Sequence, residues 1–359
     1  MKPLRTLLFT ATFVLTPLAQ ADDAARIERY VGEALGLGFN PALGVAVVRG
    51  DGEVLVDAWG RRDVGFAAPD ARTRFYIASA TKSLTGTAAA TLVAEGNLDL
   101  AAPVSEYADV SPPEGLPPQQ FSVGALLTHT HGMENDPLVV RTAYSGQHDP
   151  ALLRELVAQG TTTDSAAFDY SNEGYVIFGL ALTELSGGSD WRQGVRQRVL
   201  EPLGMSDSTA HLSQVPSDAI AMPFDYRPGD GLERIPLYKS DATLHAAGGH
   251  FMSPRDASRW LRANLTHGII DGQRRLPEEV FAMTQQARVE TGSDFGDYRR
   301  ESYGLGWHRG RYDGDVLVHH FGSFPGYRSH LSFMPERDIG VAVFTNTGGP
   351  GFPVVDLVA

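Results

Sequence analysis

The chain of 359 residues contains no cysteine, and only three of its 30 basic residues are lysines. The absence of cysteine excludes disulfides, thiolate metal ligands, a cysteine nucleophile and a cysteine-linked lipid anchor. The other basic residues are arginines, which stay protonated, whereas a buried lysine can lose its proton. Each position at which this chain uses a lysine is therefore of chemical interest, namely Lys2, Lys82 and Lys239.

Positive charge is also scarce overall. The 43 acidic residues outnumber the 30 basic ones and give a formal net charge of -13. A nucleic-acid backbone selects a basic face, so nucleic acid is excluded as a partner. With 42% apolar residues, the chain is long enough for about two domain-sized lobes at roughly 150 residues each.

Residues 1–21 are predicted to be a secretory signal peptide. Lys2 and Arg5 precede a mostly apolar run over residues 7–18, and Ala19-Gln20-Ala21 matches a small-x-small cleavage site. We expect cleavage after Ala21 and a periplasmic or secreted product. The apolar run is too short to span a bilayer comfortably, and no later run is long enough, so no membrane span is expected after cleavage.

Short β-rich runs at both ends of the chain bracket a mainly helical middle. Helical patterns cover residues 24–35, 79–95, 151–158, 174–185 and 254–265, and β-rich runs cover 43–48, 54–59, 303–309, 316–320, 327–334 and 339–345. We therefore expect an α/β fold of the α+β type, with an antiparallel sheet built from both ends of one domain, residues 22–359. The sheet lobe is expected over about 22–75 and 300–359 and the helical lobe over about 79–299, with a site in the cleft between them.

Ser79 and Lys82 are the strongest candidates for catalysis. An extended apolar segment enters a helical pattern at Ser79, and residues i and i+3 share one helix face, so the two side chains are expected to lie side by side. A serine hydroxyl is a weak nucleophile that needs a neighbouring base, and a buried lysine can supply one. The alternative is that Ser79 caps the helix and Lys82 is a solvated cation.

Other signatures of hydrolytic chemistry are missing or weaker. The sequence has no Gly-x-Ser-x-Gly elbow, which disfavours an α/β-hydrolase, and no His-Glu-x-x-His. His129 and His131 lie two residues apart on a predicted loop and could pair around a metal ion. A structural hydrogen-bonding role, or a turn that lines the site, is the favoured interpretation of the two histidines.

Tyr170 and Asn172 lie just before a helical pattern. If their turn enters the cleft, Tyr170 can exchange a proton with Ser79, and Asn172 can hold either a substrate amide or Lys82. The alternative is a tyrosine packed at a helix start and an asparagine that caps a turn.

His320, Gly322 and Ser323 lie at the end of a predicted strand. Glycine in a strand allows close approach of a ligand, and the N–H of Ser323 can pair with that of Ser79 as an oxyanion hole. Taken alone, the segment is a hairpin with aromatic neighbours.

In this order, the three motifs resemble those of the serine β-lactamase and penicillin-binding-protein superfamily, in particular its class C branch. Ser79-Ala-Thr-Lys82, Tyr170-Ser-Asn172 and His320-Phe-Gly322 match the Ser-x-x-Lys, Tyr-x-Asn and His-x-Gly (or Lys-Thr-Gly) hallmarks. Residues 126–133, 247–249, 303–307 and 341–346 are similar to further segments of that family. The resemblance extends over about residues 25–346.

The resemblance implies a β-lactamase/transpeptidase-like fold with terminal helices on the sheet, the last of them beginning within residues 353–359. It implies that Ser79 is acylated, that Lys82 and Tyr170 share the proton transfer, and that Asn172 orients the substrate. His320 takes the place of the basic residue of the third motif, and the N–H groups of Ser79 and Ser323 form the oxyanion hole. No metal or organic cofactor is expected.

His320 stands where true class C β-lactamases have a lysine, and histidine is mostly neutral near pH 7. This difference favours an esterase or a D-peptidase, with Arg328 as a candidate for the missing charge.

We thus predict an exported serine hydrolase that cleaves an ester or amide bond in a small-molecule or peptide substrate through an acyl-enzyme on Ser79. The alternatives are a class C-type β-lactamase, a non-catalytic cell-wall or ligand-binding module that uses the same cleft, and a zinc hydrolase built on His129 and His131. The motifs carry no information on the oligomeric state.

Overall fold

The computed structural model describes residues 17–65, 68–146, 149–163, 165–188, 190–295 and 298–349. Most of the predicted signal peptide and the predicted start of a C-terminal helix therefore lie outside the described residues. Among the helices of the described part, none combines the length and the apolar character needed to cross a membrane.

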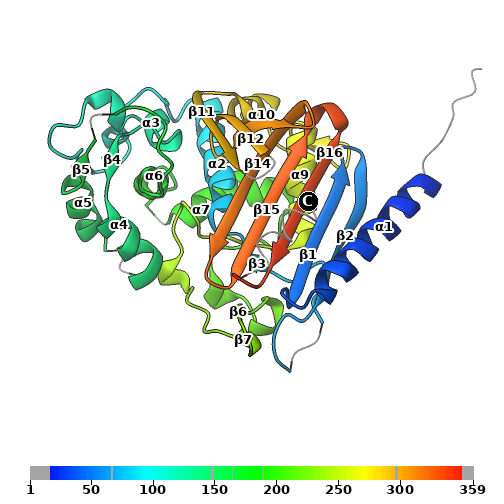
Figure 1. Cartoon of the computed structure of the whole chain (residues 1–359). Helices are drawn as coiled ribbons and strands as arrows, with labels where there is room; N and C mark the ends of the chain where they lie inside the picture. Colours follow the sequence, from blue (N-terminus) through cyan, green and yellow to red (C-terminus); the bar gives the residue numbers. More distant parts are fainter. Residues whose placement is uncertain are drawn as a thin grey trace, which may run out of the picture.

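An eight-stranded antiparallel sheet joins the two ends of the chain (Figure 1). Its strands are β1 (Ala42–Arg49), β2 (Gly52–Gly60), β11 (Val289–Phe295), β12 (Tyr298–Tyr303), β13 (His308–Tyr312), β14 (Asp315–Phe324), β15 (Tyr327–Met334) and β16 (Ile339–Thr345). They lie in the order β11-β12-β13-β14-β15-β16-β1-β2. Val45 of β1 is opposite Val343 of β16, so the N-terminal hairpin pairs directly with the last strand. The predicted α/β fold with an antiparallel sheet from both chain ends is confirmed.

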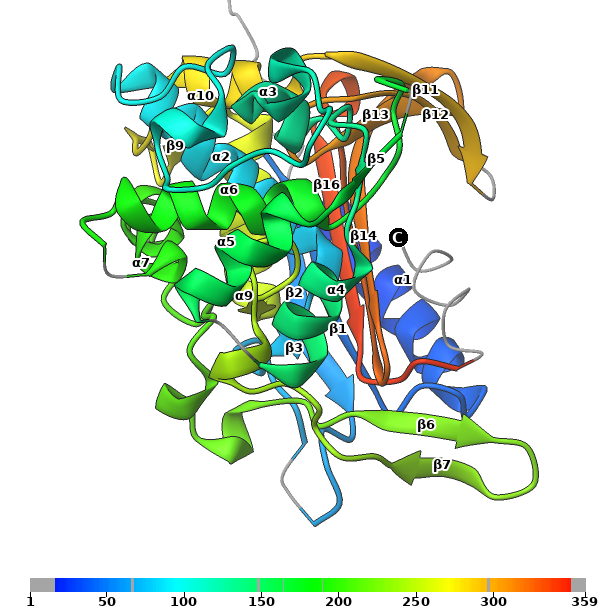
Figure 2. The same ribbon diagram turned by 90° about the vertical axis from the view of Figure 1, so that its left-hand side faces the viewer.

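Helices cover the two faces of the sheet (Figure 2). On one face lies α1 (Pro17–Gly36), whose buried Val31 and Ala34 belong to one apolar cluster with Val45 and Val343 of the sheet. The main core lies on the other face, where α2 (Thr81–Ala94), α9 (Pro254–Leu265) and α10 (Glu278–Gln285) pack. Burial of apolar side chains on both faces supplies the main stabilising free energy of such a layered fold.

The rest of the helical region consists of short elements, many with recognisable caps. The side chains of Asp149 and Ser253 accept hydrogen bonds from the first-turn N–H groups of α5 and α9, whose predicted spans are confirmed to within one residue. The remaining helices are α3 (Val123–Leu127), α4 (Asp136–Val140), α5 (Pro150–Ala158), α6 (Glu173–Glu184), α7 (Trp191–Val195) and α8 (Glu201–Leu203), with the π-helical turns η4 (Arg141–Ser145) and η5 (Arg196–Leu200).

Small ribbons and 3-10 turns complete the described fold. The two-stranded ribbons pair β3 (Phe75–Tyr76) with β8 (Phe251–Met252), β4 (Met133–Glu134) with β5 (Thr161–Thr162), β6 (Phe224–Arg227) with β7 (Gly231–Arg234), and β9 (Ile269–Ile270) with β10 (Gln273–Arg274). The 3-10 turns are η1 (Ala78–Ala80), η2 (Val104–Glu106), η3 (Pro118–Phe121), η6 (Leu212–Gln214), η7 (Ser217–Ala219), η8 (Asp241–Thr243) and η9 (Pro335–Arg337).

Two local predictions are wrong. The expected strand over residues 303–309 is interrupted, because β12 ends at Tyr303 and β13 begins at His308. Gly306 between them has a φ of 85°, and a Cβ at this position would lie 2.2 Å from the carbonyl oxygen of Lys82, so this turn packs against α2 instead of continuing the strand. Strand β11 starts at Val289, within the lobe predicted to be mainly helical. Its mostly polar sequence carries no apolar alternation, so no strand was predicted there.

Candidate active site

Ser79 lies in the η1 turn between β3 and α2, directly after a strained residue. Ala78 has a φ of 45°, a left-handed conformation that is unfavourable for a residue with a side chain. Two hydrogen bonds to Ile77 hold the turn: its N–H donates to the carbonyl of His250 at 3.0 Å, and its carbonyl accepts from the hydroxyl of Ser329 at 2.7 Å. The surrounding structure thus fixes the strained backbone that presents Ser79.

Lys82 is completely buried in the first turn of α2 and faces Ser79. Its Nζ lies 3.5 Å from the Oγ of Ser79, and it donates hydrogen bonds to the Oδ1 of Asn172 at 2.7 Å and to the carbonyl of Ala247 at 3.0 Å. Burial lowers the pKa of Lys82 to about 7, while the charge of Glu173 acts in the opposite direction. A lysine with this pKa is partly neutral at physiological pH and can accept a proton.

Tyr170 closes the other side of the Ser79–Lys82 pair. The Nζ of Lys82 lies 4.9 Å from the centre of the Tyr170 ring. Tyr170 is 39% exposed as a residue. Desolvation in the site raises the pKa of Tyr170 to about 12, against the opposing effect of a hydrogen bond with Ser79. At neutral pH, Tyr170 is therefore protonated, whereas Lys82 is in part deprotonated.

His129 and His131 hold the turn that carries Tyr170 and Asn172. The Nδ1 of His131 accepts from the N–H of Met133 at 3.1 Å, so its Nε2 carries the proton and donates to the Oγ of Ser171 at 2.9 Å. The Nδ1 of His129 accepts from the N–H of Ser171 at 3.2 Å. Both histidines thus have the hydrogen-bonding role that the sequence favours, and no group of three or more potential metal ligands is found among the described residues.

Strand β14 brings the third motif to the same place. A Cβ on Gly322 would lie 1.9 Å from the carbonyl oxygen of Ile77, so glycine is required for β14 to approach the nucleophile turn. The Nδ1 of His320 donates to the carbonyl of Phe321 at 2.8 Å, and its Nε2 lies 3.3 Å from the hydroxyl of Tyr303. Burial, with a smaller effect of Lys82, lowers the pKa of His320 to about 3. His320 is therefore neutral at working pH and does not replace the charge of a lysine.

A pocket of about 340 Å³ opens above Ser79, a volume suited to a small ligand. Of the predicted site residues, five line this pocket: Ser79, Tyr170, His320, Gly322 and Ser323. Asn172 contacts Lys82 instead of the pocket.

Two arginines also line the pocket, Arg328 and Arg300. The guanidinium of Arg300 lies 5.3 Å from the centre of the Phe321 ring. Sequence reasoning missed Arg300 because it lies on β12, of which only the final residue fell within a predicted strand. The arginines give the pocket the positive charge that His320 does not supply.

The sequence was compared with known protein families and with individual proteins. A family model described as Beta-lactamase matches residues 28–358. Penicillin-binding protein 4 of Amycolatopsis lactamdurans is 28% identical over 340 residues, which cover 91% of this chain and 84% of that protein.

Solved structures show the same fold. The octameric penicillin-binding protein homologue from Pyrococcus abyssi superposes with a TM-score of 0.77 at 24% identity, covering 94% of this chain and 76% of that one. The D-amino acid amidase from Ochrobactrum anthropi SV3, in complex with L-phenylalanine amide, superposes with a TM-score of 0.77 at 22% identity, covering 94% of this chain and 96% of that one. At these identities the likeness is one of fold.

Proposed function

The chain belongs to the Beta-lactamase family of serine hydrolases, and we propose that it is an exported hydrolase that cleaves an ester or amide bond through an acyl-enzyme on Ser79. One observation carries the proposal: the buried amine of Lys82 lies 3.5 Å from the Oγ of Ser79. With a pKa of about 7, this amine is a base of suitable strength to activate a serine hydroxyl. Assignment to the class C branch is part of the same proposal and is supported by the three sequence motifs.

In the proposed reaction, the Oγ of Ser79 bonds to the substrate carbonyl carbon while its proton passes to neutral Lys82, directly or through the hydroxyl of Tyr170. The carbonyl oxygen becomes an anion that accepts hydrogen bonds from the N–H groups of Ser79 and Ser323. The bond to the leaving group then breaks, and the departing alcohol or amine takes up the proton. A water molecule then adds to the acyl carbon and loses a proton to the same base. The bond between the acyl carbon and Oγ breaks, Oγ takes the proton from the base, and the acid leaves.

The proposed substrates are D-configured amides and peptides, together with simple esters. The fold shared with a D-amino acid amidase supports the first class at the level of the scaffold only. Arg300 and Arg328 favour substrates with a carboxylate next to the cleaved bond, because a guanidinium pairs with a carboxylate through two parallel hydrogen bonds. The same positive charge favours the class C-type β-lactamase alternative, since β-lactams also carry a carboxylate.

The test is covalent labelling followed by intact-mass measurement. Wild type and Ser79→Ala are incubated with a fluorophosphonate and with a fluorescent penicillin, and turnover is measured on p-nitrophenyl esters, D-amino-acid amides, D-Ala-D-Ala peptides and nitrocefin. We expect one adduct on the wild type and none on Ser79→Ala. Turnover that survives in Ser79→Ala contradicts the mechanism. Folded wild type that takes no label and turns over no substrate favours the non-catalytic binding module.

A further inference from the structure

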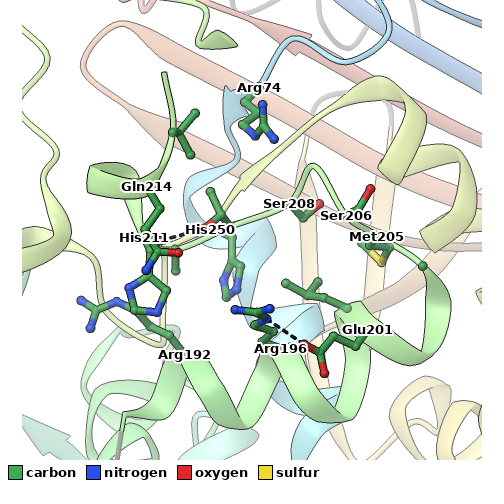
Figure 3. A pocket seen from close by; sticks show the side chains of 15 residues that line it. Arg74, Arg192, Arg196, Glu201, Met205, Ser206, Ser208, His211, Gln214 and His250 are labelled. Carbon is green, nitrogen blue, oxygen red and sulfur yellow. Dashed lines mark hydrogen bonds and ion pairs between the residues drawn. The ribbon is translucent and has the colours of Figure 1, made fainter. Parts of the chain in front are cut away.

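A second pocket, of about 440 Å³, lies away from Ser79 and is walled by α7, η5 and the loop over residues 204–215 (Figure 3). Its inner wall includes His250, which is 1% exposed and whose ring points into the pocket. Leu200, Met205, Ala210 and Val215 supply apolar lining. Both the volume and the mixture of an apolar lining with a few polar groups are typical of a site for a small organic molecule.

One wall of this pocket belongs to a cluster of arginines around a buried carboxylate. Arg72, Arg74 and Arg255 all pair with the buried Asp207, at 3.0, 3.5 and 2.8 Å respectively. The neighbouring Asp256 lies 3.9 Å from Arg255 and adds a second carboxylate to the cluster. Of the three arginines, Arg74 is the one that lines the pocket, so its guanidinium supplies the positive charge of this wall.

The other charged residues of the pocket are balanced. Arg192 pairs with Asp190 at 2.5 Å, and Arg196 pairs with Glu201 at 2.8 Å at the rim. Figure 3 shows the Arg196–Glu201 pair on the side of the His250 ring opposite to Arg74. Arg196 and Glu201 are both about half exposed, so either charge can be removed at the rim without burying an unpaired partner.

His250 adds a polar ring to the pocket, and one of its nitrogens has no partner among the described residues. Its Nδ1 is buried without a hydrogen-bond partner, and burial, reinforced by Arg192 and His211, lowers the pKa of His250 to about 3. The ring is therefore neutral and carries one N–H, which needs an acceptor. Because the ring points into the pocket, this N–H can be offered to an acceptor atom of a ligand when it is on the nitrogen that faces the pocket.

The same segment forms a wall of the catalytic site. The N–H of His250 donates to the Oγ1 of Thr81 at 3.0 Å, while the carbonyl of Ala247 accepts from Lys82 at 3.0 Å. The chain over residues 247–250 thus lies between the catalytic lysine and the second pocket.

We propose that this pocket is a second ligand site, distinct from the Ser79 pocket, for a small carboxylic acid with a short apolar body. The carboxylate is drawn to the Arg74 wall and accepts from the imidazole N–H of His250, while the apolar body contacts the aliphatic lining. A carboxylate fits better than a neutral ligand because it offers acceptors only and carries the charge opposite to the wall. The inference does not depend on the reaction catalysed at Ser79.

The test is isothermal titration of the full chain with hexanoate. Hexanamide, which has no charge, and acetate, which has no apolar body, are the matched ligands. We expect hexanoate to bind with one-to-one stoichiometry and at least about tenfold more tightly than either matched ligand. It alone has both a carboxylate for the Arg74 wall and an apolar body for the aliphatic lining. Absence of hexanoate binding at millimolar concentration, or equal binding of hexanamide, overturns the proposal.

Two rim variants of opposite sign locate the bound acid. Arg196→Gln leaves Glu201 unpaired and should weaken hexanoate binding by about fivefold, whereas Glu201→Gln should tighten it by a similar factor. Both change exposed side chains and should leave the melting temperature unchanged.

His250→Phe keeps an aromatic ring and removes the N–H, and it should weaken hexanoate binding by about tenfold. Arg300→Gln, in the Ser79 pocket, should leave the affinity unchanged; if it abolishes binding while the rim variants have no effect, the acid binds in the catalytic pocket and the proposal is wrong.

Discussion

Asn172 accepts a 2.7 Å hydrogen bond from the amine of Lys82. The asparagine of the second motif thus holds the lysine, and the carbonyl of Ala247 is the lysine's other close acceptor. Both acceptors are neutral, so neither supplies the opposite charge that would offset the burial of a charged amine, and Glu173 offsets it only in part. A carboxylate in place of Asn172 would favour the charged form and keep the lysine protonated. The neutral amide therefore helps to keep Lys82 in the range where it can act as a base.

The first prediction concerns the pH dependence of turnover. Lys82 has to be neutral to accept a proton, so kcat/KM of the wild type should rise with pH through about 7. Asn172→Asp has nearly the same shape but places a negative charge next to the amine, which should raise the midpoint by about 1–3 pH units. The measurement is the pH–rate profile of both enzymes on a neutral p-nitrophenyl ester. Identical midpoints would mean that Lys82 is not the group that limits the acidic limb.

The second prediction separates the charge of Lys82 from its ability to lose a proton. Lys82→Arg keeps the charge and should lower kcat/KM by about 10³-fold, which is the usual contribution of a general base to the rate. Lys239→Arg is the matched control, because Lys239 is also buried, and its Nζ lies 4.0 Å from the centre of the Phe324 ring and donates to the carbonyl of Ala143. It should affect thermal stability more than turnover. Full activity in Lys82→Arg would refute the role of the lysine as base.

The third prediction concerns the histidines that hold the Tyr170–Asn172 turn. His131→Ala removes the hydrogen bond to Ser171 and should lower kcat by about tenfold or more, because small displacements of catalytic groups are costly. Ser171→Ala removes the same contact, so the double variant should be no worse than His131→Ala alone. EDTA should leave wild-type activity intact. Additive losses, or inactivation by the chelator, would instead favour separate roles or the zinc alternative.

The fourth prediction tests how closely β14 must approach the nucleophile turn. Gly322→Ala puts a Cβ at 1.9 Å from the carbonyl oxygen of Ile77 and should displace the strand, with a loss of about 1–3 kcal/mol in unfolding free energy and most of the turnover. Gly52→Ala, in a β-hairpin position with open space around it, is the control. Chemical denaturation and ester hydrolysis are measured for both. Equal behaviour of the two variants would contradict the close approach.

The fifth prediction concerns Arg300 and its proposed role in binding a substrate carboxylate in the catalytic pocket. Arg300→Gln should raise KM about tenfold for substrates with a free carboxylate, such as D-Ala-D-Ala peptides, since a charge-assisted hydrogen bond is lost. Neutral esters should be hydrolysed with unchanged KM. An equal change for both kinds of substrate would show that Arg300 supports the shape of the pocket instead of binding the carboxylate.

Features that depend on short-range patterns could be predicted from the sequence. The i,i+3 spacing placed Lys82 beside Ser79, and apolar alternation located the strands that form the sheet from both chain ends. The sequence spacing of the motifs did not decide whether Asn172 binds a substrate amide or Lys82. The Lys82–Asn172 contact depends on how α2 and α6 pack against each other.

Features that depend on long-range packing could not be predicted. Arg300 lies on a polar edge region of the sheet with no apolar alternation, so neither its strand nor its place near Ser79 was apparent. The left-handed backbone of Ala78 follows Ile77, whose N–H donates to the carbonyl of His250 and whose carbonyl accepts from Ser329, two residues that are far away in the sequence. No local pattern around Ala78 reveals contacts of this kind.

The pairing of β1 with β16 has a consequence for folding. Val45 pairs with Val343, near the opposite end of the chain, so the sheet is complete only after the last strand has formed. Contacts of such high sequence separation carry a large loop-closure entropy and slow the search for the native state. Until β16 is synthesised, β1 has an open hydrogen-bonding edge of mostly apolar residues, the kind of edge that drives aggregation. Truncation before residue 339 should therefore give an insoluble chain, even though every catalytic motif is present.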